Sequence, residues 1–297
     1  MVNKHKYSWA LVLSGGGAKG LAHIGVLKAL EAAGFPKPSL VAGTSMGSIV
    51  GGLYACGMEP GEIARFVIEE FDITDYLDSF VFKMDGPVGK VFQTGQMLGN
   101  LATRPGIDTG QQVLELLEKL TEGKRFDETA IPFRCNALDL LSGREVVFSS
   151  GSVAKAMRAS MSFPVFFEPF MDNGMCLVDG GLLDNMPVGI ARKEGFKRVL
   201  AVNVSRFTRQ DAKNFRNCPR IIFRCIECSL NSMEAKKLPA DLTLNVTDNA
   251  TLFSFFKQKE LIEFGERIAK ENMQALEAFF NPRFGQSRKP KVIGTEK

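Results

Sequence analysis

Residues 9–20 read Trp-Ala-Leu-Val-Leu-Ser-Gly-Gly-Gly-Ala-Lys-Gly, and this stretch decides the expected fold. Its first five residues are apolar and stop at a glycine cluster, which is typical of a short strand buried on both faces. Apolar residues then recur at helical spacing from Leu21 to Leu30, until Gly34 closes the segment. A buried strand, a glycine-rich turn and a helix in succession indicate an α/β protein.

The same pattern recurs along the chain. Residues 39–43 predict a second buried strand, and residues 45–55 predict the helix that follows it. Residues 83–110 hold six glycines and two prolines, which predicts a mobile, only partly ordered excursion. Further strands are expected at 133–140, 144–148, 175–178, 199–204 and 242–246, the last of the sheet, and further helices at 59–80, 111–120, 153–159, 188–194 and 261–280.

The composition indicates one soluble domain and excludes several classes of partner. No Ser- or Pro-rich linker divides the chain, so we expect a single domain over residues 7–280 and a disordered, polar and basic tail at 281–297. The net charge of +4 is too diffuse for nucleic-acid binding, although it favours contact with anionic lipid surfaces. No apolar run approaches the ~18 residues of a membrane span.

Six cysteines in a chain without a secretory signal predict reduced thiols and a cytoplasmic location. Three of them, Cys218, Cys225 and Cys228, lie close together in the sequence. A zinc site needs a fourth ligand, and both histidines lie near the N-terminus. We therefore interpret the three as core thiols and expect neither a metal nor another cofactor.

Residues 43–47 (Gly-Thr-Ser-Met-Gly) fit the G-x-S-x-G pattern of a nucleophile elbow, and they lie between an expected strand and an expected helix. The flanking glycines allow the strained turn that lifts the hydroxyl of Ser45 clear of the sheet. The N-terminus of the next helix offers free N–H groups to a developing anion. Ser45 is therefore the candidate nucleophile, and the alternative is a tight turn whose serine only caps the helix.

Residues 15–20 also fit G-x-G-x-x-G, the dinucleotide-binding pattern. That function needs an acidic residue at the end of the second strand, where this chain has Gly43, Thr44 and Ser45. A nucleotide-binding oxidoreductase is therefore the weaker alternative. The same backbone N–H groups can instead stabilise the oxyanion of an acyl intermediate.

The two histidines narrow the choice of general base. His5 lies in the polar N-terminal segment and His23 lies on the first helix, where a structural role is expected. Because no histidine follows residue 23, the base for Ser45 is expected to be a carboxylate. Asp179 is the best candidate, since it stands where an apolar strand breaks into Gly180 and Gly181. Asp172 and Asp184 are weaker rivals.

Three ordered motifs together resemble the patatin-like phospholipase family, in particular its compact bacterial members. They are Ser-Gly-Gly-Gly-Ala-Lys-Gly from Ser14, Gly-Thr-Ser-Met-Gly from Gly43, and Asp-Gly-Gly from Asp179 with Asn-Met-Pro-Val close behind. Residues 158–164 (Arg-Ala-Ser-Met-Ser-Phe-Pro) also look like the family's segment ahead of the Asp motif. The likeness runs from about residue 9 to residue 204, with a weaker echo to residue 265.

The resemblance implies a three-layer α/β/α sandwich with a mostly parallel central sheet. It implies a Ser45–Asp179 dyad, with the N–H groups of Gly15, Gly16 and Gly17 as the oxyanion hole. Lys19 stands where members often have Arg, which keeps the charge but loses the bidentate fork for a phosphate. Because the family includes phospholipases, lysophospholipases, triacylglycerol lipases and general acyl hydrolases, the head group stays open.

The expected reaction is hydrolysis of a lipid ester through an acyl-enzyme on Ser45, with Asp179 as base. We expect reversible association with membrane surfaces, from residues 83–110 and the positive charge. The alternative on the same fold is a catalytically silent lipid-binding or scaffolding protein.

Overall fold

The computed structural model describes residues 8–76, 105–216, 218–234, 237–247, 254–281 and 290–295. The central sheet is built from short strands, several of them buried along their whole length. In chain order they are β1 (Ala10–Leu13), β2 (Leu40–Gly43), β4 (Phe133–Asp139), β5 (Arg144–Phe148), β7 (Phe170–Asp172), β8 (Met175–Asp179), β9 (Val199–Asn203), β10 (Leu242–Asn245) and β11 (Lys291–Gly294). The described part of the chain also contains a separate pair, β3 (Gly106–Asp108) and β6 (Val165–Phe167).

The sheet is mostly parallel, as the sequence predicts. Its order is β11–β10–β9–β1–β2–β4–β8–β7, with β5 paired to β4. All pairings from β11 to β4 are parallel, whereas β8, β7 and β5 pair in the antiparallel direction. The α/β fold class with a mostly parallel sheet is therefore confirmed.

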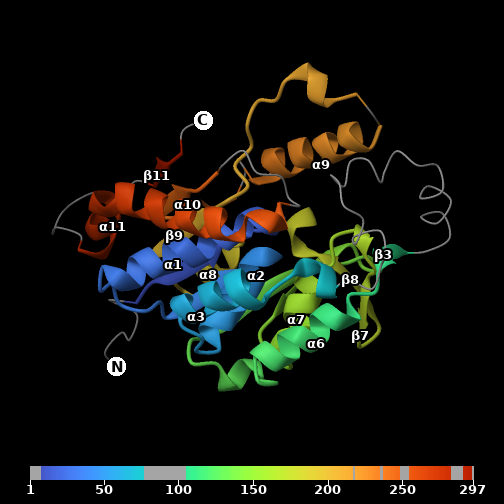
Figure 1. Ribbon diagram of the computed structural model, residues 1–297, viewed down its shortest axis with the longest axis horizontal. Helices are drawn as coiled ribbons and strands as arrows, with labels where there is room; N and C mark the ends of the chain where they lie inside the picture. Colours follow the sequence, from blue (N-terminus) through green and yellow to red (C-terminus); the bar gives the residue numbers. More distant parts are fainter. Residues whose placement is uncertain are drawn as a thin grey trace.

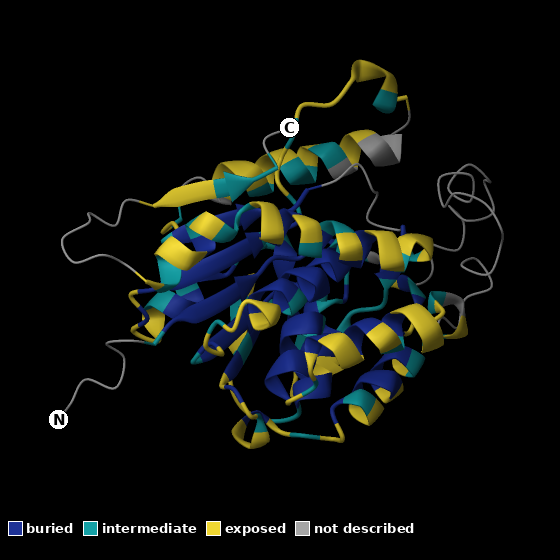
Figure 2. Ribbon diagram, turned by 60° about the vertical axis from the view of Figure 1, so that its left-hand side comes forward, coloured by how far each residue is buried: buried dark blue, intermediate teal, exposed yellow. Residues whose placement is uncertain are grey.

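Helices cover both faces of the sheet (Figure 1). Alternate residues of β1 point to opposite faces, because side chains alternate along a strand. Leu11 and Leu13 enter the larger core, and Ala10 and Val12 enter the smaller core, which also contains residues of the helix α8 (Val188–Lys193). Figure 2 shows the buried residues gathered on the strands and on the inner sides of the helices. The helices are α1 (Ala22–Ala32), α2 (Met46–Ala55), α3 (Pro60–Arg65), α6 (Gln111–Leu120), α7 (Val153–Ser160), α8 (Val188–Lys193), α9 (Cys218–Glu234), α10 (Gln258–Glu271) and α11 (Met273–Phe280).

Two helices differ from the sequence prediction. The expected helix at 261–280 is divided into α10 and α11 at Asn272, whose side-chain amide donates to the Ile268 carbonyl at 2.9 Å. Such a bond competes with the helical backbone pattern and favours a break. The expected helix at 59–80 ends earlier, because α3 widens into a π-helical turn at Phe66–Glu70 and the chain is extended at Phe71.

Two further expectations are wrong. Residues 291–294, placed in a disordered tail, form β11, and 242–246 is therefore not the last strand. The edge of β10 that β9 leaves unpaired offers backbone N–H and carbonyl groups to β11. The polar composition of residues 281–297 gives no sign of this pairing.

Cys225 and Cys228 are exposed on α9 rather than buried as core thiols. The Pro- and Gly-rich excursion at 83–110 lies outside the described residues up to residue 104, and residues 106–108 form β3.

Candidate active site

The chain turns sharply between β2 and α2, at Ser45. Ser45 adopts φ 52° and ψ −125°, a strained conformation for a residue other than glycine. The turn closes only because its flanking residues lack side chains. A Cβ on Gly43 would lie 2.3 Å from the Gly47 carbonyl oxygen, and a Cβ on Gly47 would lie 2.3 Å from the Leu13 carbonyl oxygen. The geometry is that of a nucleophile elbow, with the Ser45 side chain at the N-terminus of α2.

The glycine loop after β1 lies beside this turn. β1 and β2 are parallel neighbours with Leu13 opposite Gly43, so their following loops meet at one edge of the sheet. A Cβ on Gly15 would lie only 3.1 Å from the Ser45 Cβ. The loop is braced from the end of β9, where the Val204 N–H donates to the Ser14 hydroxyl at 3.0 Å and the Ser205 hydroxyl donates to the Gly15 carbonyl at 2.7 Å.

The three glycines of this loop differ in the state of their N–H groups. The Gly15 N–H donates to the Asn185 carbonyl at 3.0 Å and is therefore engaged. Within the described residues, the N–H groups of Gly16 and Gly17 have no acceptor. Gly17 has a positive φ of 55° and opens a short 3₁₀ helix, Gly17–Leu21. Two of the three expected donors thus have no acceptor among the described residues.

Asp179 reaches the same edge of the sheet from the opposite direction. The sequence predicts Asp179 at the end of an apolar strand, and this strand, β8, is antiparallel to β4. β4 is longer than β2, and the residues beyond Cys135, the partner of Gly43, pair with β8. Asp179 comes to lie opposite Ala137, just past the end of β2. The direction of β8 therefore brings Asp179 back toward the Ser45 turn.

The Asp179 carboxyl group is buried, with 2% of the residue exposed. Burial raises its pKa from 3.8 to about 6, against the opposing effect of two hydrogen bonds. One comes from the Ser45 side chain, and the other comes from the Gly181 N–H to Oδ1 at 2.7 Å. Ser45 and Asp179 are thus in direct contact, although 134 positions separate them in the sequence (179 minus 45).

The segment 158–162 connects these two residues, a role that the sequence reasoning did not assign to it. The Ser45 N–H donates to the Ser160 hydroxyl at 2.9 Å, and the Asp179 N–H donates to the Ser162 carbonyl at 3.0 Å. Arg158 is buried and anchors the segment, because its guanidinium donates to the Ser162 hydroxyl and to the Gly110 carbonyl. The sequence signal for this segment was the likeness of residues 158–164 to the family's segment ahead of the Asp motif.

A second polar network holds the loop behind Asp179. The Thr44 hydroxyl and the Asn136 amide both donate to the Asp184 carbonyl oxygen, each at 3.0 Å. The Asp184 carboxylate lies 2.9 Å from the Lys237 ammonium in an ion pair. The other rival, Asp172, accepts a bond from the neighbouring Asn173 at 2.9 Å. Neither contacts Ser45 in the described interactions.

His23 and Lys19 flank the glycine loop without contacting Ser45 in the described interactions. His23 is fully buried, and its Nε2 donates to the Ser14 carbonyl at 2.8 Å. Burial lowers its pKa to about 4, so the ring is neutral at pH 7 and holds the loop. Lys19 is half-buried, with no anionic partner in the described part of the chain. No group of three His, Cys, Asp or Glu side chains suited to a metal ion occurs there either.

The fold and this site together define an α/β protein with a nucleophile elbow facing a glycine loop. The family model described as patatin-like phospholipase matches residues 11–192. The chain therefore belongs to the patatin-like phospholipase family, as its three motifs indicate.

Individual relatives agree with this membership. Lysophospholipase NTE1 from Kluyveromyces lactis is 37% identical over 196 residues, which are 65% of this chain and 12% of that protein. Patatin-like phospholipase domain-containing protein 6 from Homo sapiens is 33% identical over 209 residues, 69% of this chain and 14% of that protein. The chain thus spans a small part of these relatives. The structure of VipD from Legionella pneumophila shares the fold, with a TM-score of 0.52 and 19% identity over 91% of this chain and 67% of that one.

Proposed function

We propose that this chain is a serine acyl hydrolase acting on lipid esters through a Ser45–Asp179 dyad. The observation that carries the proposal is the hydrogen bond between the strained Ser45 and the buried Asp179 carboxyl group. Family membership and the printed names of the relatives, lysophospholipase and patatin-like phospholipase, support a phospholipid or lysophospholipid as substrate.

In the proposed mechanism the Ser45 hydroxyl attacks the ester carbonyl while Asp179 takes its proton. The N–H groups of Gly16 and Gly17 stabilise the oxyanion, and those at the N-terminus of α2 add their positive dipole end. Asp179 then returns the proton to the leaving alcohol. Water hydrolyses the acyl-enzyme with Asp179 again as base. Gly15 shapes the loop beside Ser45 in this scheme, because its N–H is already engaged.

Lys19 is the proposed contact for a charged head group. Its ammonium carries the positive charge nearest to the glycine loop in the sequence and has no anionic partner among the described residues. A lysine binds phosphate as a point charge rather than bidentately. This supports a substrate with a phosphate close to the scissile ester.

Hydrolysis of a short-chain nitrophenyl ester tests the proposed activity. We expect turnover that needs neither a divalent metal nor a nucleotide, since the proposed chemistry uses only side chains and backbone N–H groups of this chain. The assay is run with purified protein before and after dialysis against a chelator. Absence of turnover on both nitrophenyl and lysophospholipid esters would contradict the proposal, and activity restored only by calcium or zinc would contradict the metal-free mechanism.

The pH dependence of hydrolysis follows from the raised pKa of Asp179. The carboxylate form is the base, and its pKa in the free enzyme is about 6. Below that value kcat/KM should fall about tenfold for each pH unit, because the protonated acid accepts no proton, and above it kcat/KM should level off. Steady-state kinetics on a neutral ester give the profile. An inflection near pH 4 would show that Asp179 titrates as an ordinary carboxyl group and would contradict the burial argument.

Reversible association with lipid surfaces is proposed together with a cytoplasmic location. The net charge of +4 favours anionic membranes, and within the described residues no helix is long and apolar enough to cross one. Flotation with anionic liposomes should recover the protein in the lipid fraction at low salt and release it at high salt, since surface charges are screened. Protein that stays with the aqueous fraction at low salt would favour a small water-soluble ester.

A further inference from the structure

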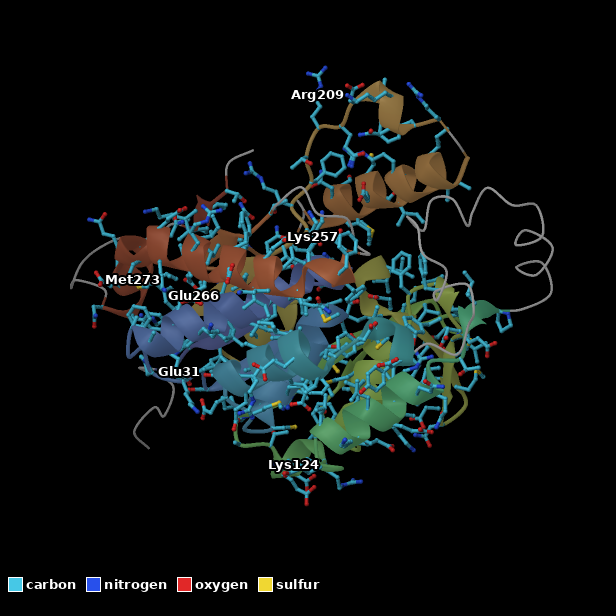
Figure 3. The ribbon with its side chains drawn as sticks, in the orientation of Figure 1. Glu31, Lys124, Arg209, Lys257, Glu266 and Met273 are labelled. Atoms are coloured by element: carbon cyan, nitrogen blue, oxygen red, sulfur yellow. The ribbon has the colours of Figure 1, made fainter. Side chains whose placement is uncertain are left out.

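Helix α9 presents an apolar face that the rest of the described chain does not cover. It lies apart from the layers that enclose the sheet, next to the segment that carries Arg209 (Figures 1 and 3). None of the described side chains of α9 is buried, and Ile221 and Ile222 are 47% and 54% exposed. Most of the stability of a helix within a protein comes from packing of its apolar face. The apolar face of α9 is therefore a candidate binding surface for an apolar group.

The opposite side of α9 is already held by the chain. The Arg224 guanidinium lies 3.9 Å from the centre of the Phe207 ring and donates to the Thr208 carbonyl at 2.6 Å. Just beyond the C-terminal end of α9, Lys237 donates to the Leu183 carbonyl at 2.9 Å and pairs with Asp184. These contacts fix α9 against the loop that follows Asp179.

Between α9 and this loop lies a groove of about 460 Å³. The volume is in the range of roughly 300–1,000 Å³ that small-molecule sites occupy. Among the described residues, its lining carries no charged or aromatic side chain. The aliphatic side chains that line it are Leu182, Ile221, Ile222, Ile226, Leu230 and Met233.

One residue of the groove, Leu182, lies three positions after Asp179. Leu182 ends the short 3₁₀ helix Gly180–Leu182, whose N-terminal cap is Asp179. Leu182 thus connects the groove to the turn of chain that carries Asp179. An unbranched hydrocarbon chain matches a long aliphatic lining whose described residues offer no charge and no aromatic ring.

We propose that this groove binds the acyl chain of the ester substrate, with α9 as its outer wall. The inference rests on the proposed function and adds a chain-length preference to it. Esters of medium and long acyl chains gain contacts along α9, whereas short esters reach Ser45 without touching it. Differences of a single methylene group in an apolar pocket are worth about tenfold or more in kcat/KM, so the preference should be large.

Thiol protection tests the binding site without any catalysis. Cys225 lines the groove, and Cys228, also exposed and about one turn along α9, does not, so it serves as an internal control. Laurate at about ten times its dissociation constant should slow alkylation of Cys225 about tenfold and leave the rate at Cys228 unchanged. Butyrate should slow neither rate. Timed iodoacetamide treatment of the full-length protein, followed by mass spectrometry that locates each modified cysteine, measures both rates. Equal slowing of both thiols, or none, would overturn the assignment.

Substitution in the groove tests the same inference in turnover. Ile222→Gln should lower kcat/KM for a dodecanoyl nitrophenyl ester about tenfold and leave the butyryl ester within about twofold. Ile68→Gln, at a residue of similar exposure (43%) outside the groove, should change neither. A wild-type protein that hydrolyses neither ester contradicts the proposed function itself. If the wild type hydrolyses both esters but Ile222→Gln leaves the ratio of the two kcat/KM values unchanged, only the assignment of the groove is contradicted. If Ile222→Gln also loses thermal stability while that ratio stays unchanged, the apolar face of α9 packs against its own chain instead.

Discussion

Replacing Asp179 by Asn should abolish ester hydrolysis while making the folded protein more stable above pH 6. The amide fills the same space and can still accept the Gly181 N–H, but it takes no proton from Ser45. We expect kcat to fall by about 10³-fold or more, close to the loss for removal of the nucleophile. Single-turnover and steady-state assays on a nitrophenyl ester measure the loss.

The stability of the same variant provides a second readout. The pKa of Asp179 is raised from 3.8 to about 6 by burial, so the unfolded chain ionises first as the pH rises. Wild-type stability therefore falls between about pH 4 and pH 6, by up to about 3 kcal/mol in total. An uncharged amide at this position would carry no such penalty, so thermal unfolding at pH 8 should occur at a higher temperature in Asp179→Asn. A variant that is less stable at pH 8 would contradict the burial of an ionised carboxylate.

His23→Ala is the matched control for the choice of base. His23 is buried and neutral, and its hydrogen bond to the Ser14 carbonyl holds the glycine loop. Its loss should cost about 1–3 kcal/mol of stability through the missing bond and the cavity, but should retain most turnover. If His23→Ala were inactive while Asp179→Asn stayed active, the proposed base would be wrong and His23 would be the partner of Ser45.

Ser45→Ala should eliminate turnover with little change in the fold. The substitution removes one half-buried hydroxyl and leaves the backbone bond from Ser45 N–H to Ser160 intact. A loss of about 10³-fold or more is expected, because no other described hydroxyl donates to Asp179. Circular dichroism should match the wild type, whereas thermal unfolding above pH 6 should occur at a somewhat lower temperature, because the buried Asp179 carboxylate loses the hydrogen bond from the Ser45 side chain. Retention of more than a few per cent of turnover would remove Ser45 from the mechanism.

The double variant Ser45→Ala/Asp179→Asn distinguishes a dyad from two independent contributors. Residues that act as a unit fail together, so the combined loss should equal the larger single loss rather than the product of the two. Additive losses would show that the two residues act on separate steps. The comparison uses the same ester and the same pH, about 8, where Asp179 is ionised.

The sequence alone determined the local parts of this protein. The apolar run 9–13, the glycine cluster after it and the elbow at 43–47 are short-range patterns, and each predicted a strand, a turn or a helix start that the structure contains. These patterns succeed because backbone conformation there depends on neighbouring residues, above all on glycines that permit the strained turn at Ser45. They also identified the family, since three ordered motifs leave few alternatives.

Only the tertiary structure decided how the parts meet. The antiparallel direction of β8, which returns Asp179 to Ser45, depends on pairing with the overhang of β4. The Asn185 carbonyl engages one of the three glycine N–H groups, and Ser160 and Ser162 hold Ser45 and Asp179 from one segment. Strand direction and long-range hydrogen bonds follow from the packing of distant segments, which short-range sequence patterns do not specify.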